Sequence, residues 1–95
     1  MARALWNGVV IADSDRCEVL DDNQYFPHTD VKREFLVASE THTFCPWKGQ
    51  ASYYHVVVDG QTNPDAAWYY PDTIVDTAKR VENYVAFWHG VTVEV

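Results

Sequence analysis

The strongest strand pattern in the chain is Ala51-Ser52-Tyr53-Tyr54-His55-Val56-Val57-Val58. Aromatic and β-branched side chains dominate this stretch, and such residues favour extended backbone. Turn-forming residues stand on both sides of it. We interpret Pro46-Trp47-Lys48-Gly49 as a hairpin turn and the residues from Asp59 to Asp65 as a surface loop. The centre of the chain is therefore predicted to be β-sheet.

Shorter strand patterns lie on either side of this centre. Asn7-Gly8 supplies the positive φ angles of a type I′ turn, so residues 3–12 are predicted to form a hairpin. Runs of apolar, aromatic and β-branched residues, in part alternating with polar ones, predict further strands at 17–20, 25–27, 35–39, 41–45, 66–70 and 91–95.

A single α-helix is expected from about Thr73 to Asn83. Ile74, Ala78 and Val81 recur there at three- and four-residue spacing, which is the period of an amphipathic helix. The predicted fold is mainly β: one antiparallel domain over residues 1–95 with one α-helix.

Charge and composition restrict the partners. The 95 residues include 14 acidic and 7 basic ones, giving a net charge of -7, so phosphate backbones and anionic lipids are repelled. Neither nucleic acid nor a membrane is expected as a partner. No apolar run is long enough to cross a bilayer, and the first residues lack the apolar core of a secretory leader. We expect a cytoplasmic protein in which Cys17 and Cys45 are free thiols.

Cys45 stands at the end of a predicted strand, three residues before Lys48, whose ammonium favours a thiolate. His42 and His55 are candidate bases. Two hairpin registers are open: a loop ending at Gly49 sets Cys45 opposite Gln50, whereas a loop ending at Gln50 brings His55 to its side. The candidate catalytic residues are therefore Cys45, Lys48 and His55. The alternative is that Cys45 is a small buried hydrophobe.

Aromatic residues crowd two neighbouring predicted strands. Adjacent residues of a strand face opposite sides, so Tyr53 and Tyr54 cannot enter the same core, and one of them is expected to face outward or line a cleft. Aromatic side chains that do not enter the core can line a small-molecule pocket or form a subunit interface. The candidate ligand-binding residues are Trp47, Tyr53, Tyr54, Trp68 and Tyr70.

Three stretches carry a family resemblance: residues 25–31, 43–54 and 66–71. The most specific is Thr43-Phe44-Cys45-Pro46-Trp47-Lys48-Gly49-Gln50-Ala51-Ser52-Tyr53-Tyr54. Together they resemble the bacterial and archaeal family catalogued as domain of unknown function 427, over nearly the whole chain. The resemblance implies a β-rich tent similar to the zinc-binding Mss4 proteins, and the family carries a nucleotidyltransferase-like label.

The chain lacks the residues that the label and a zinc site require. Nucleotidyltransferases hold Mg²⁺ on paired Asp residues after a Gly-Ser loop, and no such loop precedes Asp13-Ser14-Asp15. Zinc tents use paired C-x-x-C knuckles, which are missing from this sequence. His42 and Cys45 have a usable two-ligand spacing, and the further candidate donors are Cys17, His28, His55 and His89. We expect no bound metal and no cofactor.

These observations predict a small soluble domain that binds a small molecule in an aromatic-walled cleft with a Cys/Lys/His polar cluster. Whether it catalyses a reaction is left open by the residues. The alternative is a non-catalytic protein-interaction or homo-oligomerisation domain that uses the same aromatic surface, with a homodimer as the expected assembly.

Overall fold

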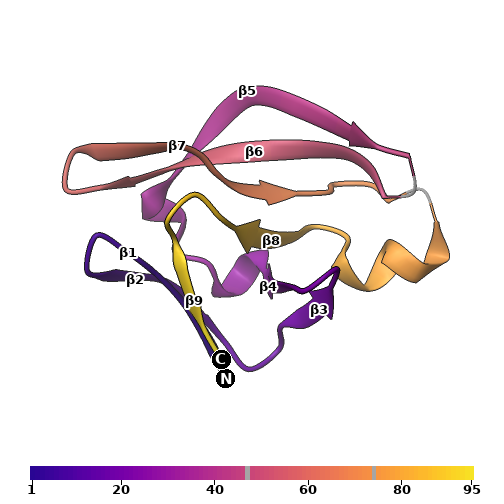
Figure 1. Cartoon of the computed structure of the whole chain (residues 1–95), viewed down its shortest axis with the longest axis horizontal. Coiled ribbons are helices and arrows are strands. Elements are labelled where there is room, and N and C mark those ends of the chain that lie inside the picture. The colour runs from indigo at the N-terminus through magenta and orange to yellow at the C-terminus, as the bar shows by residue number, and fades with distance from the viewer. Residues whose placement is uncertain (47, 74) are drawn as a thin grey trace.

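The computed structural model describes residues 1–46, 48–73 and 75–95, with the backbone alone for Thr77. The described residues form two antiparallel sheets (Figure 1). The smaller has the order β2 (Val9–Ser14), β1 (Ala2–Trp6) and β9 (Thr92–Glu94). The larger has the order β3 (Glu18–Leu20), β4 (Asn23–Pro27), β8 (Tyr84–Phe87), β7 (Gln61–Tyr69), β6 (Gly49–Val58) and β5 (Leu36–Cys45). The mainly β, antiparallel prediction is confirmed.

Two-residue turns set the hairpins. Asn7 and Gly8 have φ of 53° and 77° and join β1 to β2, which confirms the type I′ prediction. Asp59 and Gly60, with φ of 50° and 76°, join β6 to β7 in the same way. The surface loop expected up to Asp65 is therefore wrong, because β7 already begins at Gln61.

The expected α-helix is also wrong: the described part of the chain contains only 3-10 turns. These are η1 (His28–Asp30), η2 (Arg33–Phe35) and η3 (Asp76–Val81), and the last of them lies within the predicted helix. Ala78 and Val81 are buried, and their three-residue spacing suits a 3-10 helix as well as an α-helix. Ile74 lies outside the described residues.

The local hydrogen bonds explain why the η3 segment stays short. Thr73 does not cap a helix; instead its backbone N–H and its hydroxyl both donate to the Glu82 carboxylate, each at 2.9 Å. The bond from the Thr73 backbone, together with those from Lys79 and the Thr73 hydroxyl, lowers the pKa of Glu82 to about 2. The segment is thus closed as a loop, and Tyr84 enters β8 immediately after it.

Hydrophobic side chains cover both faces of the six-stranded sheet. Strand β4 shows this most directly, because Phe26 and Tyr25 are neighbours and both are fully buried, yet they belong to different clusters. The first cluster packs between the two sheets and includes Ile11, Phe26 and Val85. We call the second the tyrosine cluster; its buried members are Tyr25, Ala51, Tyr53, Tyr70, Val81 and Ala86, with Leu20, Cys45, Trp68 and Tyr84 at its edge.

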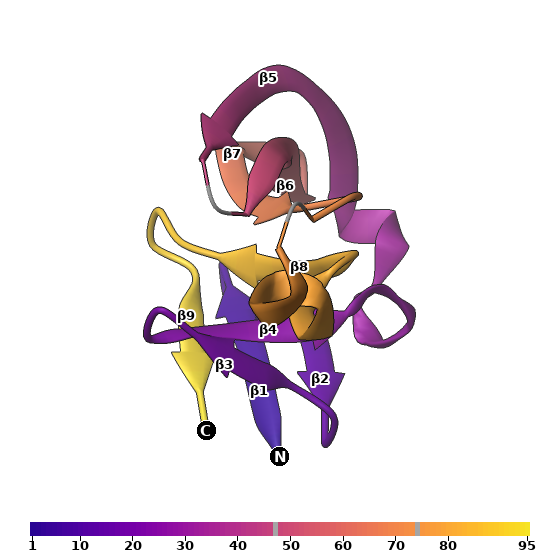
Figure 2. The same ribbon diagram turned by 90° about the vertical axis from the view of Figure 1, so that its right-hand side faces the viewer.

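Irregular pairing in the β5–β6–β7 layer changes which face of β6 is buried. The register shifts between Ala38 and His42 of β5 and between Tyr54 and Val56 of β6. The buried residues of β6 accordingly switch from Gly49, Ala51 and Tyr53 to Val56 and Val58. Such bulges bend a strand, and β5 arches strongly over its neighbours in Figure 2. One strand therefore contributes side chains to both clusters.

Candidate functional site

The β5–β6 hairpin brings Cys45 and Lys48 to the tyrosine cluster. Cys45 pairs with Gly49, so the loop contains three residues and has neither of the two expected registers. On this register Cys45 shares a face with Ala51 and Tyr53, both of which are buried. Cys45 itself is a half-buried free thiol at the edge of the cluster.

Lys48 is a buried cation. Only 8% of the residue is exposed, and its Nζ lies 2.9 Å from Asp21 Oδ2 and 5.3 Å from the centre of the Tyr70 ring. Burial acts to lower the pKa of Lys48, but the hydrogen bond to Asp21 and the nearby Tyr25 and Tyr70 outweigh it, so the pKa is raised. The ammonium is thus charged at neutral pH.

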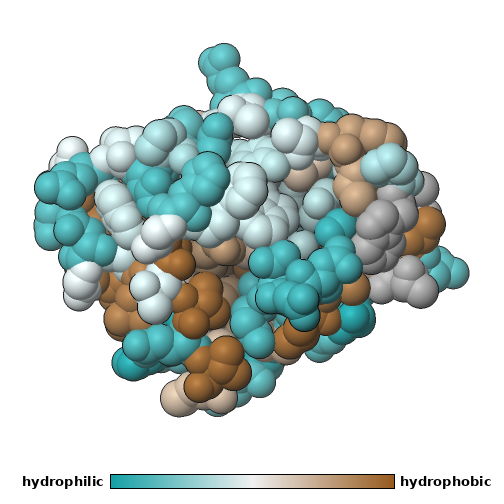
Figure 3. All heavy atoms as spheres, in the orientation of Figure 1, coloured by the Kyte–Doolittle hydropathy of each residue, from teal (hydrophilic) through white to brown (hydrophobic). Residues whose placement is uncertain are grey.

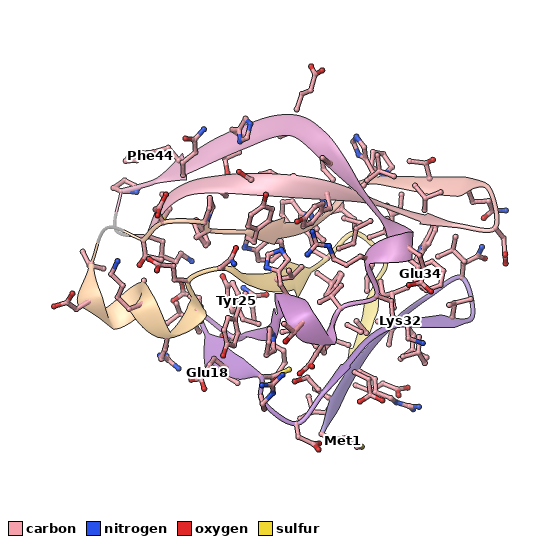
Figure 4. All side chains as sticks on the ribbon, turned by 180° about the vertical axis from the view of Figure 1, so that it is seen from behind. Met1, Glu18, Tyr25, Lys32, Glu34 and Phe44 are labelled. Carbon is pink, nitrogen blue, oxygen red and sulfur yellow. The ribbon has the colours of Figure 1, made fainter. Side chains whose placement is uncertain are left out.

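Tyr25 is the most unusual residue of the cluster. Its side chain is completely buried, and its hydroxyl has no hydrogen-bond partner among the residues that the structure describes. Its ring packs edge-on against Trp68 at 6.2 Å, and Tyr25 is one of the groups that raise the pKa of Lys48. Figure 4 shows Tyr25 in the interior, below the long strands β5 and β6. An orphaned buried hydroxyl is rare in folded proteins.

Of the residues predicted for the site, Tyr53, Trp68 and Tyr70 lie in or against the tyrosine cluster with Cys45 and Lys48. The Tyr53 hydroxyl bonds Thr43 Oγ1 at 2.8 Å. Trp47 lies outside the described residues.

The structure does not bring His55 to Cys45. Six residues of β6 separate His55 from Gly49, the partner of Cys45, which is roughly 20 Å along a strand. His55 Nδ1 instead accepts the Asp65 backbone N–H at 3.1 Å. The Asp65 carboxylate accepts the hydroxyls of Ser39 and Thr41 at 2.5 and 2.8 Å. This polar group ties the irregular parts of β5, β6 and β7 together.

Tyr54 belongs to a second polar group on the opposite face of the sheet. Its hydroxyl lies 3.1 Å from His28 Nε2, and its ring stacks on Tyr69 at 4.9 Å. His28 Nδ1 contacts the Asn83 carbonyl, which can only accept, so Nδ1 carries the proton and Nε2 accepts from Tyr54.

Burial and the neighbouring Tyr69 raise the pKa of Tyr54 to about 12, while burial lowers the pKa of His28. Both groups are therefore neutral at pH 7. Sequence reasoning missed this pairing because His28 precedes Tyr54 by 26 residues and no local pattern joins them.

A surface pocket lies away from the tyrosine cluster and from the Tyr54–His28 pair. It is a shallow hollow of about 140 Å³ near the chain ends, which lie side by side in Figure 1. It is lined by Met1, Ala2, Ser14, Asp15, Cys17, Gln24 and Val95. The Ser14 hydroxyl, part of the Asp13-Ser14-Asp15 motif, donates to Asp30 Oδ2 at 2.5 Å.

Metal-binding groups are absent from the described residues: no three His, Cys, Asp or Glu side chains converge. His42, one of the spaced donors, lies 3.2 Å from the Ser52 hydroxyl through its Nδ1. In the same part of the chain, no helix has the length and apolar character needed to span a membrane.

Comparison with known proteins places the chain in a family. The model of the family described as "Domain of unknown function (DUF427)" matches residues 1–95, the full length given. The chain therefore belongs to this family, as its three conspicuous stretches predicted. No curated protein matches it.

Proposed function

We propose that this domain binds a small molecule within the tyrosine cluster. The residues that receive it are Tyr25, Cys45, Lys48, Tyr53, Trp68 and Tyr70. The observation that carries the proposal is the Tyr25 hydroxyl, which is fully buried in a cluster bordered by the Lys48 ammonium and has no partner in the described residues. A buried unpaired hydroxyl costs about 1–3 kcal/mol, so its presence is better accounted for by a ligand than by folding.

The route into the cluster runs past the Asp21–Lys48 ion pair. Asp21 lies in the two-residue turn between β3 and β4, and β3 is a three-residue strand at the edge of its sheet. Short edge strands are held by few interactions and open locally at low free-energy cost. Displacing this turn exposes the Lys48 ammonium and then the Tyr25 and Tyr70 hydroxyls.

The test uses phenol as a neutral aromatic probe, with binding followed by nuclear magnetic resonance of ring-labelled tyrosine. We expect saturable shifts at Tyr25, Tyr53 and Tyr70, and weaker binding in Tyr25→Phe. Tyr69→Phe, which removes a hydroxyl from the opposite face of the sheet, is the matched control and should bind as the parent does. Shifts confined to Tyr54 and Tyr69, or no shifts at all with phenol, benzoate or phenyl phosphate, would refute the proposal.

Cys45 remains the proposed reactive group of this site, with Lys48 as its neighbour. Its reactivity is measured by alkylation with iodoacetamide, using Cys17 as the internal reference. Burial raises the pKa of Cys17, so that thiol is expected to react slowly. Equal, slow alkylation of both thiols would assign Cys45 a packing role only.

A second candidate function is protein interaction or homo-oligomerisation. It is favoured by exposed aromatic side chains: 68% of Phe44, on β5, and 43% of Trp88 are exposed. Figure 4 places Phe44 at the rim of the molecule, and Figure 3 shows further apolar surface over the three-stranded sheet. Light scattering over a dilution series decides this function: a concentration-dependent homodimer supports it, and a monomer throughout argues for the ligand.

The fold relationship and the location of the protein are proposed as well. We propose that the two sheets form a tent of the Mss4 type, which superposition on a solved Mss4 protein tests. We also propose a cytoplasmic location, consistent with two free thiols, and cell fractionation checks it.

A further inference from the structure

The geometry points to an aromatic carboxylate as the ligand of the tyrosine cluster, with Asp21 as the internal carboxylate that it displaces. This inference rests on the proposed binding function and names the chemistry of its ligand. In the free protein, Asp21 Oδ2 lies 2.9 Å from Lys48 Nζ, the place proposed for the carboxylate of the ligand. Asp21 itself belongs to a turn at the molecular surface.

The ion pair between Lys48 and Asp21 is asymmetric. The Lys48 side chain is 10% exposed, whereas the Asp21 side chain is 51% exposed. Asp21 thus approaches the ammonium from the solvent side. Tyr25 and Tyr70, both buried, act on the same ammonium from within the cluster.

An incoming carboxylate can engage more donors than Asp21 does. Asp21 bonds Lys48 and leaves the Tyr25 hydroxyl without a partner in the described residues. A ligand carboxylate between these groups would accept from both Lys48 Nζ and the Tyr25 hydroxyl, next to the Tyr70 ring, whose centre lies 5.3 Å from that Nζ. The bond that the ligand gains from the Tyr25 hydroxyl is charge-assisted and about twice as strong as a neutral one, and this additional bond favours exchange of Asp21 for the ligand.

The surroundings of Lys48 select the charge and shape of the ligand. The chain has a net charge of -7, so a dianion such as a phosphate ester is repelled more than a carboxylate. Lys48 lies over the Tyr70 ring at the border of a largely aromatic cluster that also includes Tyr53 and Trp68. Rings of this kind favour a flat aromatic body behind the carboxylate.

The experiment compares benzoate, phenol and phenyl phosphate by titration of the folded protein. Benzoate is expected to bind most tightly. Asp21→Asn removes the competing carboxylate and should tighten benzoate binding by roughly tenfold, the factor that corresponds to one charge-assisted hydrogen bond. Asp22→Asn changes the net charge equally and is the matched control; its effect should stay within roughly twofold. Tyr25→Phe should weaken benzoate by roughly tenfold and bring its affinity close to that of phenol.

The outcomes separate the two proposals. If phenol binds in the cluster but benzoate binds no more tightly, or if phenyl phosphate binds best, the site stands and the carboxylate assignment is overturned. The carboxylate assignment is also overturned if Asp21→Asn behaves like Asp22→Asn. If none of the three probes shifts the cluster residues, the proposed function itself fails.

Discussion

Tyr25 carries a hydroxyl in an interior that would hold a phenyl ring equally well. Its ring packs against Trp68, and its polar atom finds no acceptor in the described part of the chain. Tyr53, on the same side of the sheet, shares its hydroxyl with Thr43. These two tyrosines look alike in the sequence but have opposite energetic roles, because a hydrogen bond depends on what the fold places opposite the hydroxyl.

Replacing Tyr25 by Phe is therefore expected to stabilise the free protein by about 1 kcal/mol, since it removes an unsatisfied buried hydroxyl and leaves the ring in place. Tyr53→Phe is the contrasting variant. It removes the hydrogen bond to Thr43, so the free energy of unfolding should fall by about 1 kcal/mol. Urea unfolding followed by tryptophan fluorescence measures both. A destabilised Tyr25→Phe protein would mean that this hydroxyl is already satisfied in solution.

The partly buried His28 imidazole is expected to make the stability of the folded protein depend on pH. Burial lowers its pKa from the ordinary value of 6.5. The unfolded chain then binds a proton at this site at a higher pH than the folded chain does, so stability falls as the pH drops below about 6.5. Urea midpoints between pH 7.5 and 5 should decline accordingly, and less steeply in His28→Gln. A direct check is the titration of the His28 ring by nuclear magnetic resonance, where a pKa of 6.5 or above would contradict the prediction.

At the scale of elements, turn chemistry was the most informative part of the sequence. Asn7-Gly8 predicted its hairpin correctly because both residues tolerate positive φ. Asp59-Gly60 has the same chemistry, but Asn63-Pro64 nearby favoured a long loop. The structure accommodates Pro64 in the irregular part of β7, where Asp65 has a φ of 53°. Proline is tolerated at a bulge, so it did not end the strand.

The sequence also predicted only part of the arrangement of the candidate site residues. Cys45, Tyr53 and Tyr70 follow from the hairpin and its neighbouring strand and lie in one cluster, and Lys48 contacts that cluster at Tyr70. Tyr25 was missed because β4 reaches the cluster from far away in the sequence, through β8. His55 was misplaced because the irregular pairing after Tyr54 is not visible in a run of aromatic and β-branched residues.

Gly60→Ala tests the turn that joins β6 to β7. An added Cβ meets no atom within 4 Å, so the expected loss of about 1 kcal/mol comes from the positive φ of 76° alone. Gly60→Asn should lower the free energy of unfolding by less, because asparagine tolerates this backbone region. Thermal or urea unfolding gives both values, and equal losses for Ala and Asn would show that side-chain contacts decide the cost.

At the scale of the whole molecule, one sheet separates two hydrophobic clusters of different composition. The fully buried members of the cluster between the sheets are small, aliphatic and phenyl side chains, with Cys17, Tyr54 and Tyr69 partly buried against it, whereas the buried members of the tyrosine cluster include three tyrosines. Tyr53 and Tyr54 illustrate the division. They were expected to face opposite sides, and they do, but the second side is also covered. The fully buried side chains that the structure describes in the cluster between the sheets thus carry no polar group, and the buried hydroxyls proposed for the site lie on the other face of the larger sheet.

The adjacent chain ends have a consequence for engineering the order of the strands. Arg3 pairs with Glu94, and continuing this register sets Ala2 opposite Val95. Two linking residues, Asn-Gly in place of Met1, would therefore turn β9 and β1 into a type I′ hairpin. A circular permutant closed in this way and opened between Asp59 and Gly60 is expected to unfold cooperatively, because both changes fall at exposed turns. Its urea transition should retain the steepness of the parent chain, and a broadened one would reveal that β6 and β7 must be covalently joined for the larger sheet to assemble.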